Sequence, residues 1–294
     1  MKVFLYSQKL KEKDIKHVHT LFDVLGEKGV EVLVDSDYHG QLVDKGVLYK
    51  EMESISHFSD ALEKGVEMVI TLGGDGTILN AIEVVQNSKI PIIGINLGRL
   101  GFLSSIEKSK IRESISNVLN GEYYTEERTL LKLGSNIPLF EDTPYALNDF
   151  TLHKRDTSSM ITIHTYVDGN FLNSYWADGL VVSTATGSTG YALSCGGPII
   201  FPSSKDIVIT PVAPHNLNVR PIVISDFKKI SFEIEGRSEN FLCTLDSRYE
   251  TITSEHQLFV ERAPFYIKLA HPNDITFMKT IRSKLMWGLD RRNH

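Results

Sequence analysis

The first hundred residues alternate short apolar runs with longer stretches whose apolar positions recur at helical spacing. The apolar, partly β-branched runs predict buried strands at 3–6, 31–34, 67–72 and 91–96. The intervening stretches predict helices at 11–28, 58–64, 78–85 and 110–120, whereas the polar segment 36–55 predicts a loop. Strands that alternate with helices favour βαβ units and a parallel sheet covered by helices.

From about residue 123 the pattern changes to short strands separated by turns. The expected strands are 129–133, 146–154, 160–167, 171–176, 207–210, 221–224, 230–235, 241–246, 257–260 and 265–269. Asp168-Gly169 is typical of a hairpin turn, and no helix is expected between about 122 and 273. We therefore predict an α/β domain of residues 1–122 and a mostly antiparallel β domain of residues 123–275. The helical pattern at 277–287 predicts a C-terminal segment, 276–294, that packs back on the first domain.

Composition narrows the possible partners. The chain has 294 residues, 23% of them charged, and a net charge of −6 without a basic run, which argues against a nucleic-acid partner. No apolar stretch approaches the roughly 20 residues that cross a bilayer, so no membrane partner is expected. The two cysteines, Cys195 and Cys243, predict no disulfide framework and fit a reducing cytoplasm.

The most informative stretch is Gly73-Gly74-Asp75-Gly76-Thr77, between an expected strand and an expected helix. Backbone N–H groups at such a turn can point at a phosphate, and glycine lets the backbone approach a ligand. A carboxylate there would repel phosphate unless a metal or a reacting hydroxyl lies between them. The turn therefore favours phosphoryl transfer to an alcohol, with Asp75 taking or orienting the proton. The alternative is a structural turn with Asp75 as helix N-cap.

A glycine-spaced loop, 97–103, follows the strand that ends at Asn96. In parallel sheets, ligands collect at the carboxyl ends of strands, where Asp75 and Asn96 would both lie. Phe102 belongs either to the core or to a surface that packs against a flat ring; the loop also contains Arg99 and Leu100.

Three stretches stand out in the β domain. Neighbouring Asn148 and Asp149 would reach one ligand only at a strand end or kink, so a solvated pair at a bend is the simpler interpretation. Residues 177–191 contain five serine and threonine side chains, and their hydroxyls suit phosphate and ribose oxygens; this density favours a binding role over a simple turn. In the proline-rich loop 210–221, His215 is favoured as a hydrogen-bonded loop residue, and Arg220 could equally face phosphate or close an ion pair.

Several common site motifs are missing from the chain: the Walker loop, the GxGxxG fingerprint, HExxH, zinc-ligand spacing and the GxSxG elbow. Their absence disfavours a hydride-transferring dinucleotide enzyme despite the α/β first half.

In their order, these stretches resemble the NAD kinase family. The matching motifs are GGDGT at 73–77, LGFL at 100–103, an Asn-acidic pair at 148–149, DG…TGST-Y at 178–191 and PH…RP at 214–221. The resemblance implies transfer of the γ-phosphoryl group of ATP, with Mg²⁺, to the 2′-hydroxyl of the adenosine ribose of NAD. It also implies a cytoplasmic homodimer or homotetramer.

The resemblance assigns roles residue by residue. Asp75 would be the catalytic carboxylate, with Gly74, Gly76 and Thr77 near the nucleotide, and no protein side chain is assigned as a metal ligand. Phe102 would line the adenine pocket, and Asn148 and Asp149 would hold ribose hydroxyls or the adenine edge. Asp178 would bind the nicotinamide end. The remaining lining residues would be Thr186, Thr189, Gly190, Tyr191 and Ser194.

The sequence departs from the family pattern at three positions. The acidic partner of Asn148 is usually glutamate, so Asp149 has a shorter reach, and the usual TPTGSTAY reads TATGSTGY with Ala185 and Gly190. None of these changes removes a reacting group. Two other functions stay open: a lipid or sugar kinase, which the negative charge disfavours, and a nucleotide-binding sensor, which retention of Asp75 disfavours.

Overall fold

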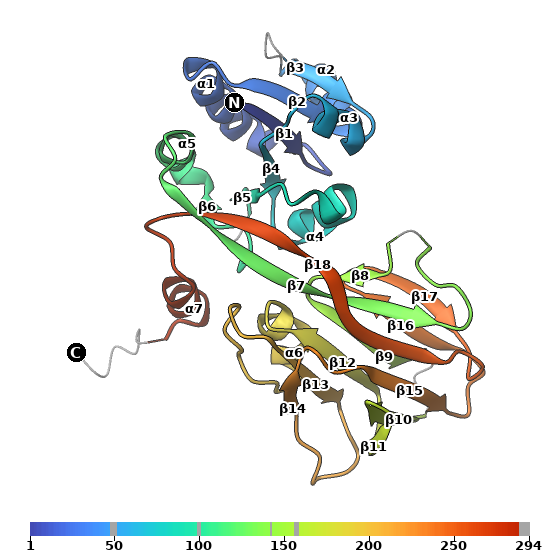
Figure 1. Ribbon diagram of the computed structural model, residues 1–294. Helices are drawn as coiled ribbons and strands as arrows, with labels where there is room; N and C mark the ends of the chain where they lie inside the picture. Colours follow the sequence, from blue (N-terminus) through green and yellow to red (C-terminus); the bar gives the residue numbers. More distant parts are fainter. Residues whose placement is uncertain (48–51, 99–100, 142, 156–158, 288–294) are drawn as a thin grey trace. The chain divides into compact units, whose positions relative to one another are not determined.

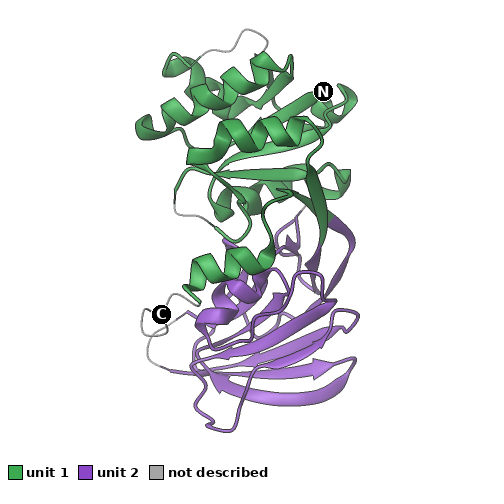
Figure 2. Cartoon of the chain, turned by 90° about the vertical axis from the view of Figure 1, so that its left-hand side faces the viewer, with its two compact units in different colours: residues 1–127, 267–294 green, residues 128–266 purple. Residues whose placement is uncertain are grey.

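The computed structural model describes residues 1–47, 52–98, 101–141, 143–155 and 159–287. The chain divides into two units, one of residues 1–127 with 267–294 and one of residues 128–266 (Figure 2). The division therefore lies at 127 and 267, rather than at the expected 122 and 276. Strands β7 (Tyr123–Ser135) and β18 (Leu258–Pro272) each contribute residues to both units.

Unit 1 is the α/β part of the chain. Its parallel strands lie in the order β3-β2-β1-β4-β5 (Figure 1). The strands are β1 (Lys2–Tyr6), β2 (Glu31–Asp35), β3 (Met52–Ile55), β4 (Met68–Gly73), β5 (Ile92–Asn96) and the short β6 (Ile106–Glu107). The helices are α1 (Ile15–Glu27), α2 (Ser36–Asp44), α3 (Phe58–Glu63), α4 (Asp75–Val85), α5 (Ile111–Leu119) and α7 (Phe277–Leu285). The predicted parallel sheet is confirmed.

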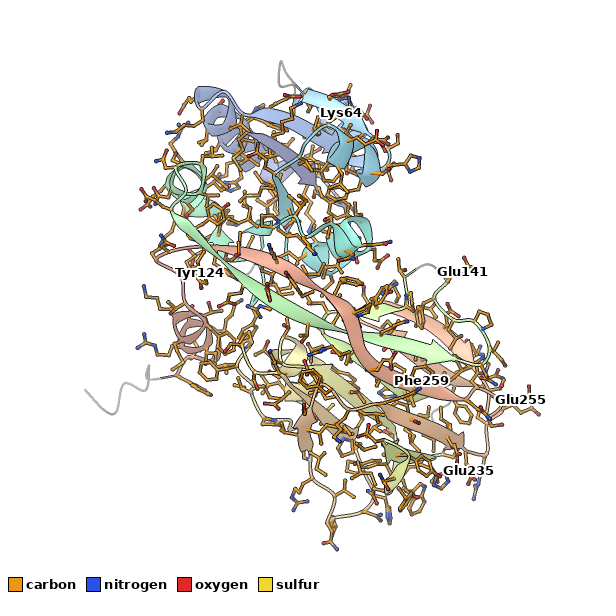
Figure 3. All side chains as sticks on the ribbon, viewed as in Figure 1. Lys64, Tyr124, Glu141, Glu235, Glu255 and Phe259 are labelled. Atoms are coloured by element: carbon orange, nitrogen blue, oxygen red, sulfur yellow. The ribbon has the colours of Figure 1, made fainter. Side chains whose placement is uncertain are left out.

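The C-terminal segment groups with unit 1, as expected. Tyr124, labelled in Figure 3, donates a hydrogen bond from its hydroxyl to the carbonyl of Ile275 at 2.9 Å, which anchors the chain just before α7. The side chain of Thr276 then caps α7 by accepting from Lys279 N. Ile281 is the buried residue of this helix.

Unit 2 is built from antiparallel strands in two sheets that share one core. The first sheet has the order β14-β13-β12-β9-β16-β17, and the second contains β11-β10-β15 and the first part of β18. The strands are β8 (Tyr145–Ala146), β9 (Asp149–Lys154), β10 (Ile161–Val167), β11 (Asn170–Ala177), β12 (Gly179–Thr184), β13 (Asp206–Val212), β14 (Ile222–Ser225), β15 (Ile230–Glu235), β16 (Phe241–Leu245) and β17 (Arg248–Ile252). Phe150 of β9 and Phe232 of β15 meet between the sheets, with ring centroids 5.2 Å apart.

Two expectations about local structure were wrong. The segment 36–55 is not an irregular loop: it contains α2, whose Tyr38 and Leu42 are buried one helical turn apart, and β3. The Asp35 side chain starts α2 by accepting a hydrogen bond from Tyr38 N at 3.2 Å. The region expected to lack helix also contains a 3₁₀ turn, Gly187–Thr189, and α6 (Tyr191–Ser194), which fold within the hydroxyl-rich segment.

Candidate functional site

The GGDGT stretch forms the predicted strand, turn and helix. Strand β4 ends at Gly73, and Gly74 is the N-cap of α4. A Cβ on Gly73 would lie 2.0 Å from Thr77 Oγ1, because the buried Thr77 folds back over the turn. By contrast, apart from the adjoining backbone, no atom of the described residues lies within 4 Å of where a Cβ would stand on Gly74 or Gly76, so the backbone there is open to a ligand.

The Asp75 carboxylate holds the loop that follows β5. It accepts hydrogen bonds from three consecutive backbone N–H groups: Phe102 at 2.7 Å on Oδ2, and Leu103 and Ser104 at 3.1 and 3.0 Å on Oδ1. A Cβ on Gly101 would lie 1.7 Å from Asp75 Oδ1, so only glycine permits this approach. Asp75 is thus the first residue of α4 and bridges to another loop, and the N-cap interpretation was wrong.

The strand ends meet as expected. Leu97 N donates to the carbonyl of Gly73 at 3.1 Å, and the buried Asn96 accepts from Gly98 N on Oδ1 at 2.7 Å. Phe102 is only half-buried, so it is not a core residue. Arg99 and Leu100 of the same loop lie outside the described residues.

In unit 2, the Asn148-Asp149 pair occupies the strand end that sequence reasoning required. Strand β9 begins at Asp149, and both side chains turn toward Gly190. A Cβ on Gly190 would lie 3.8 Å from Asp149 Oδ2 and 3.9 Å from Asn148 Nδ2. Since Asp149 is only 7% exposed, the solvated-pair interpretation was wrong. An amide and a carboxylate that converge on one point can bind a diol.

Asp246, at the tip of the β16–β17 hairpin, is a residue that sequence reasoning missed. Its carboxylate accepts from the consecutive N–H groups of Leu147, Asn148 and Asp149 at 2.9, 2.8 and 3.1 Å. Burial of this carboxyl raises its pKa, although the hairpin-tip residue itself is partly exposed. Burial, and then the nearby Asp246 carboxyl, raise the pKa of Asp149 to about 7. The sequence offered only a weak signal for Asp246, namely an aspartate at a turn between two strands. In the structure, Asp246 has a φ of +53°.

Most serine and threonine hydroxyls of residues 177–191 form hydrogen bonds within the fold of this segment and its neighbours. Ser183, Thr184, Ser188 and Thr189 each donate to a backbone carbonyl. The buried Arg128 donates to Thr186 Oγ1 at 3.4 Å. Of the predicted lining residues here, Tyr191 and Ser194 are exposed on α6, while Thr189 and Gly190 are half-buried. The segment therefore offers a small set of accessible groups on a rigid, internally bonded frame.

Asp178 and Tyr191 gain partners from β9 that were not foreseen. Lys154 Nζ lies 2.5 Å from Asp178 Oδ1, and His153 Nε2 lies 2.9 Å from the Tyr191 hydroxyl. The His153 and Tyr191 rings stack at 6.1 Å. A Cβ on Gly179 would lie 2.4 Å from the Leu152 carbonyl oxygen, so this glycine permits the close pairing of β9 and β12 that aligns these groups.

The proline-rich loop carries no reacting group. His215 donates from its backbone N–H to the Trp176 carbonyl at 2.9 Å, and its ring lies 4.2 Å from the Trp176 ring, which confirms it as a hydrogen-bonded loop residue. Arg220 donates to the carbonyls of Leu217 and Val219 at 2.6 and 2.7 Å. One guanidinium nitrogen, Nη1, makes both of these hydrogen bonds within its own loop, which neither interpretation anticipated.

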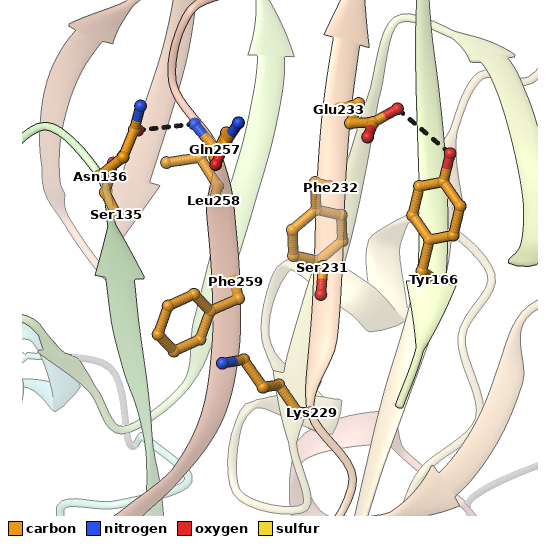
Figure 4. A pocket seen from close by; sticks show the side chains of 10 residues that line it. All are labelled: Ser135, Asn136, Tyr166, Lys229, Ser231, Phe232, Glu233, Gln257, Leu258 and Phe259. Carbon is orange, nitrogen blue, oxygen red and sulfur yellow. Dashed lines mark hydrogen bonds between the residues drawn. The ribbon is translucent and has the colours of Figure 1, made fainter. Parts of the chain in front are cut away.

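A separate hollow of about 510 Å³ lies on unit 2, away from these motifs (Figure 4). Lys229 lies over the Phe259 ring at 3.5 Å, and the Tyr166 hydroxyl donates to Glu233 at 3.1 Å. The hollow contains none of the predicted site residues. Each charged side chain that lines the hollow already has a neutral partner: Lys229 lies over the Phe259 ring, and Glu233 accepts from the Tyr166 hydroxyl.

Among the residues that the structure describes, no three His, Cys, Asp or Glu side chains gather closely enough to hold a metal ion. None of the helices described is long and apolar enough to cross a bilayer.

Comparison with known proteins covers nearly the whole chain. Residues 3–123 match the family model of the ATP-NAD kinase N-terminal domain, and residues 147–271 match that of the ATP-NAD kinase C-terminal domain. The NAD kinase of Cytophaga hutchinsonii is 46% identical over 290 residues, covering 98% of this chain and 99% of that protein. The NAD kinase of Bacteroides fragilis is 44% identical over 292 residues, covering 99% of this chain and 100% of that protein.

Solved structures show the same fold. Yeast NADH kinase complexed with NADH has a TM-score of 0.86 at 22% identity, covering 98% of this chain and 88% of that chain. An NAD kinase from Archaeoglobus fulgidus in complex with ATP has a TM-score of 0.73 at 24% identity, covering 97% of this chain and 99% of that chain. These likenesses extend to both units, since each covers nearly all of this chain.

Proposed function

The chain belongs to the ATP-NAD kinase family, and on that premise we propose that it transfers the γ-phosphoryl group of ATP to the 2′-hydroxyl of the adenosine ribose of NAD. The product is NADP. The observation that carries the proposal is the convergence of Asn148 and Asp149 on Gly190, because a neighbouring amide and carboxylate suit the hydroxyls of a ribose. The open backbone at Gly74 and Gly76 supplies N–H groups for phosphate.

Asp75 orients the reacting hydroxyl or takes its proton. A carboxylate has about four acceptor positions, and three of those on Asp75 are filled by the 102–104 backbone. Since Oδ2 accepts only one of these hydrogen bonds, it retains room for the ribose hydroxyl. The three bonds hold the carboxylate in place, so little reorganisation is needed when the substrate arrives.

Each unit has further predicted residues that we assign to nucleotide binding. In unit 1, the half-buried Phe102, next to the backbone that Asp75 holds, contacts adenine, and Thr77 lies in the glycine turn. In unit 2, Asp178, paired with Lys154, binds the nicotinamide end. The other assigned residues of unit 2 are Thr186, Thr189, Tyr191 and Ser194.

Mg²⁺ enters this proposal with ATP. Mg²⁺ commonly binds through substrate phosphates with one or two carboxylates, so the phosphates of ATP would supply most of its ligands. Such an ion would neutralise charge on the transferring phosphoryl group. We also propose a cytoplasmic enzyme, in keeping with the two free cysteines. A homodimer or homotetramer would cover exposed apolar side chains such as Phe171, Trp176 and Phe227.

The direct test is to incubate purified protein with ATP, Mg²⁺ and NAD and to couple NADP formation to an NADP-specific dehydrogenase. We expect ATP-dependent NADP production. The proposal would be contradicted if no product formed with NAD, with NADH as the acceptor, or with polyphosphate in place of ATP. A lipid or sugar acceptor would then be tested. Light scattering after size-exclusion chromatography would test the oligomeric state.

A further inference from the structure

We propose that Asp246 is a positioning residue for NAD, because it fixes the backbone from which Asn148 and Asp149 reach the ribose. The inference rests on the function proposed above and extends it to a residue outside the recognised motifs. Asp246 stands on the β16–β17 hairpin, whereas the residues that it holds precede and begin β9.

The contact between the hairpin tip and the ribose-binding pair is reciprocal. The Asp246 carboxylate accepts from the three N–H groups of residues 147–149, while Asp246 N donates to the Asp149 carbonyl at 2.9 Å. These N–H groups precede the pairing of β9 with β16, which begins at Phe150, although Asp149 already lies opposite Ser183 of β12. On the β16 side, the Asp246 carboxylate therefore takes the place of a strand partner as their acceptor.

Arg248 extends the same clamp in the opposite direction along the chain. Its guanidinium donates to Thr143 at the carbonyl and at Oγ1, both at 2.7 Å, and to the Tyr145 carbonyl. Two residues of one hairpin tip thus hold the segment 143–149. The whole approach to Asn148 and Asp149 is tied to this tip.

The opposite side of Asn148 is fixed by the hydroxyl-rich turn. Its carbonyl accepts from Thr184 N at 2.9 Å and from Ser183 Oγ at 3.2 Å. A Cβ on Gly187 would lie 2.2 Å from the same carbonyl oxygen. Asn148 is therefore held between two elements, and releasing one side would let the amide and carboxylate move apart. Displacements of about 1 Å in a binding group are enough to change activity by orders of magnitude.

The test compares Asp246→Asn with Asp168→Asn. Asp168 is a matched control because it also lies at a two-residue hairpin tip with positive φ, +49° against +53°, and accepts from Lys229 N and Lys228 Nζ. We expect Asp246→Asn to raise KM for NAD by about tenfold or more while KM for ATP changes less than about twofold. Asp168→Asn should leave both constants within about twofold. Equal KM values for NAD in the two variants would overturn the proposal.

A second variant covers the case in which Asp246→Asn does not fold. Arg248→Gln leaves the Asp246 acceptor in place but frees residues 143–145, so we expect a smaller rise in KM for NAD than in Asp246→Asn. An unchanged KM for NAD in Arg248→Gln, together with faster amide exchange at 143–149, would show a merely structural role and overturn the proposal.

Amide hydrogen exchange separates this inference from the proposed function. If the wild-type protein makes no NADP, the proposed function fails, but the positioning role is still tested by NAD affinity measured by calorimetry. Faster exchange at Leu147, Asn148 and Asp149 together with weaker NAD binding in Asp246→Asn would support it. Faster exchange with unchanged NAD affinity would refute it.

Discussion

Asp75 in unit 1 and Asp246 in unit 2 use the same device: each carboxylate accepts from three consecutive backbone N–H groups of a distant segment. Asp75 begins a helix after a parallel strand, beside glycines with open space around them. Asp246 lies at a hairpin tip, and burial raises the pKa of its carboxyl. In the roles that we propose, the Asp75 carboxylate meets the substrate, whereas the Asp246 carboxylate holds the residues that bind it.

The largest effect is expected from Asp75→Asn. The amide keeps one acceptor oxygen but cannot take a proton, and its NH₂ group would face backbone donors. We expect kcat to fall by about 10³-fold, or about 4 kcal/mol of barrier, with folding and NAD affinity retained.

Coupled NADP assays and calorimetry would measure these effects. The control is Asp35→Asn, at an aspartate that also accepts a backbone N–H in unit 1, from Tyr38, and should leave kcat unchanged. Near-normal turnover of Asp75→Asn would refute its assigned role.

Gly101→Ala should disrupt the contact between the Asp75 carboxylate and the 102–104 backbone without changing the Asp75 side chain itself. The new Cβ would lie 1.7 Å from Asp75 Oδ1, so the loop or the carboxylate must move. We expect a loss of kcat/KM of about 10²-fold. The control is Gly98→Ala, where a Cβ would meet Asn96 Oδ1 at an ordinary 3.6 Å and nothing closer among the residues that the structure describes. Equal kinetics in these two variants would contradict the proposed dependence on the loop.

Gly187→Ala tests the corresponding contact in unit 2. A Cβ 2.2 Å from the Asn148 carbonyl oxygen should push that residue aside, raising KM for NAD by about tenfold. Gly190→Ala should change it less than about threefold, because the nearest atom would be the Gly187 carbonyl oxygen at 3.1 Å. Steady-state kinetics of both variants would measure KM for NAD. A larger rise in Gly190→Ala than in Gly187→Ala would contradict the proposed importance of the Gly187 contact.

The smallest expected effect is a pH dependence centred on Asp149. Its pKa is raised to about 7 by burial and by Asp246, with Tyr191, Cys195 and Arg248 also near this carboxyl pair. Because the folded-state pKa lies above the unfolded value, this group's contribution to the free energy of unfolding is present below about pH 4. It is lost as pH rises to about 7, at no more than about 1.4 kcal/mol per pH unit.

NAD binding should change in the opposite direction, because the ionised Asp149 is the better acceptor for ribose hydroxyls. We expect KM for NAD to fall several-fold between pH 6 and pH 8. In Asp149→Asn, both this pH dependence and the associated change in thermal stability should flatten. Unchanged pH profiles in that variant would assign the titration to another group.

Sequence patterns gave the elements of unit 1 well because their signals are local. The apolar run before Gly73 and the helical spacing after Asp75 each describe one continuous segment, and both elements are present. Helix α2 was missed because its buried face consists of only Tyr38 and Leu42 within a polar stretch. In unit 2, β17 was missed because only Ile252 of its residues is buried.

The sequence by itself determined the α/β and antiparallel halves, the glycine turn before α4 and the order of the motifs. Apolar periodicity and the conformational freedom of glycine depend only on residues that are close together in the sequence. Only the tertiary structure decided that Asp75 holds residues 102–104, which lie 27 to 29 positions away, and that Asp246 holds residues 147–149, which lie 97 to 99 positions away. No local spacing specifies such pairs, because strand pairing and loop packing bring the carboxylates to the backbone that they bind.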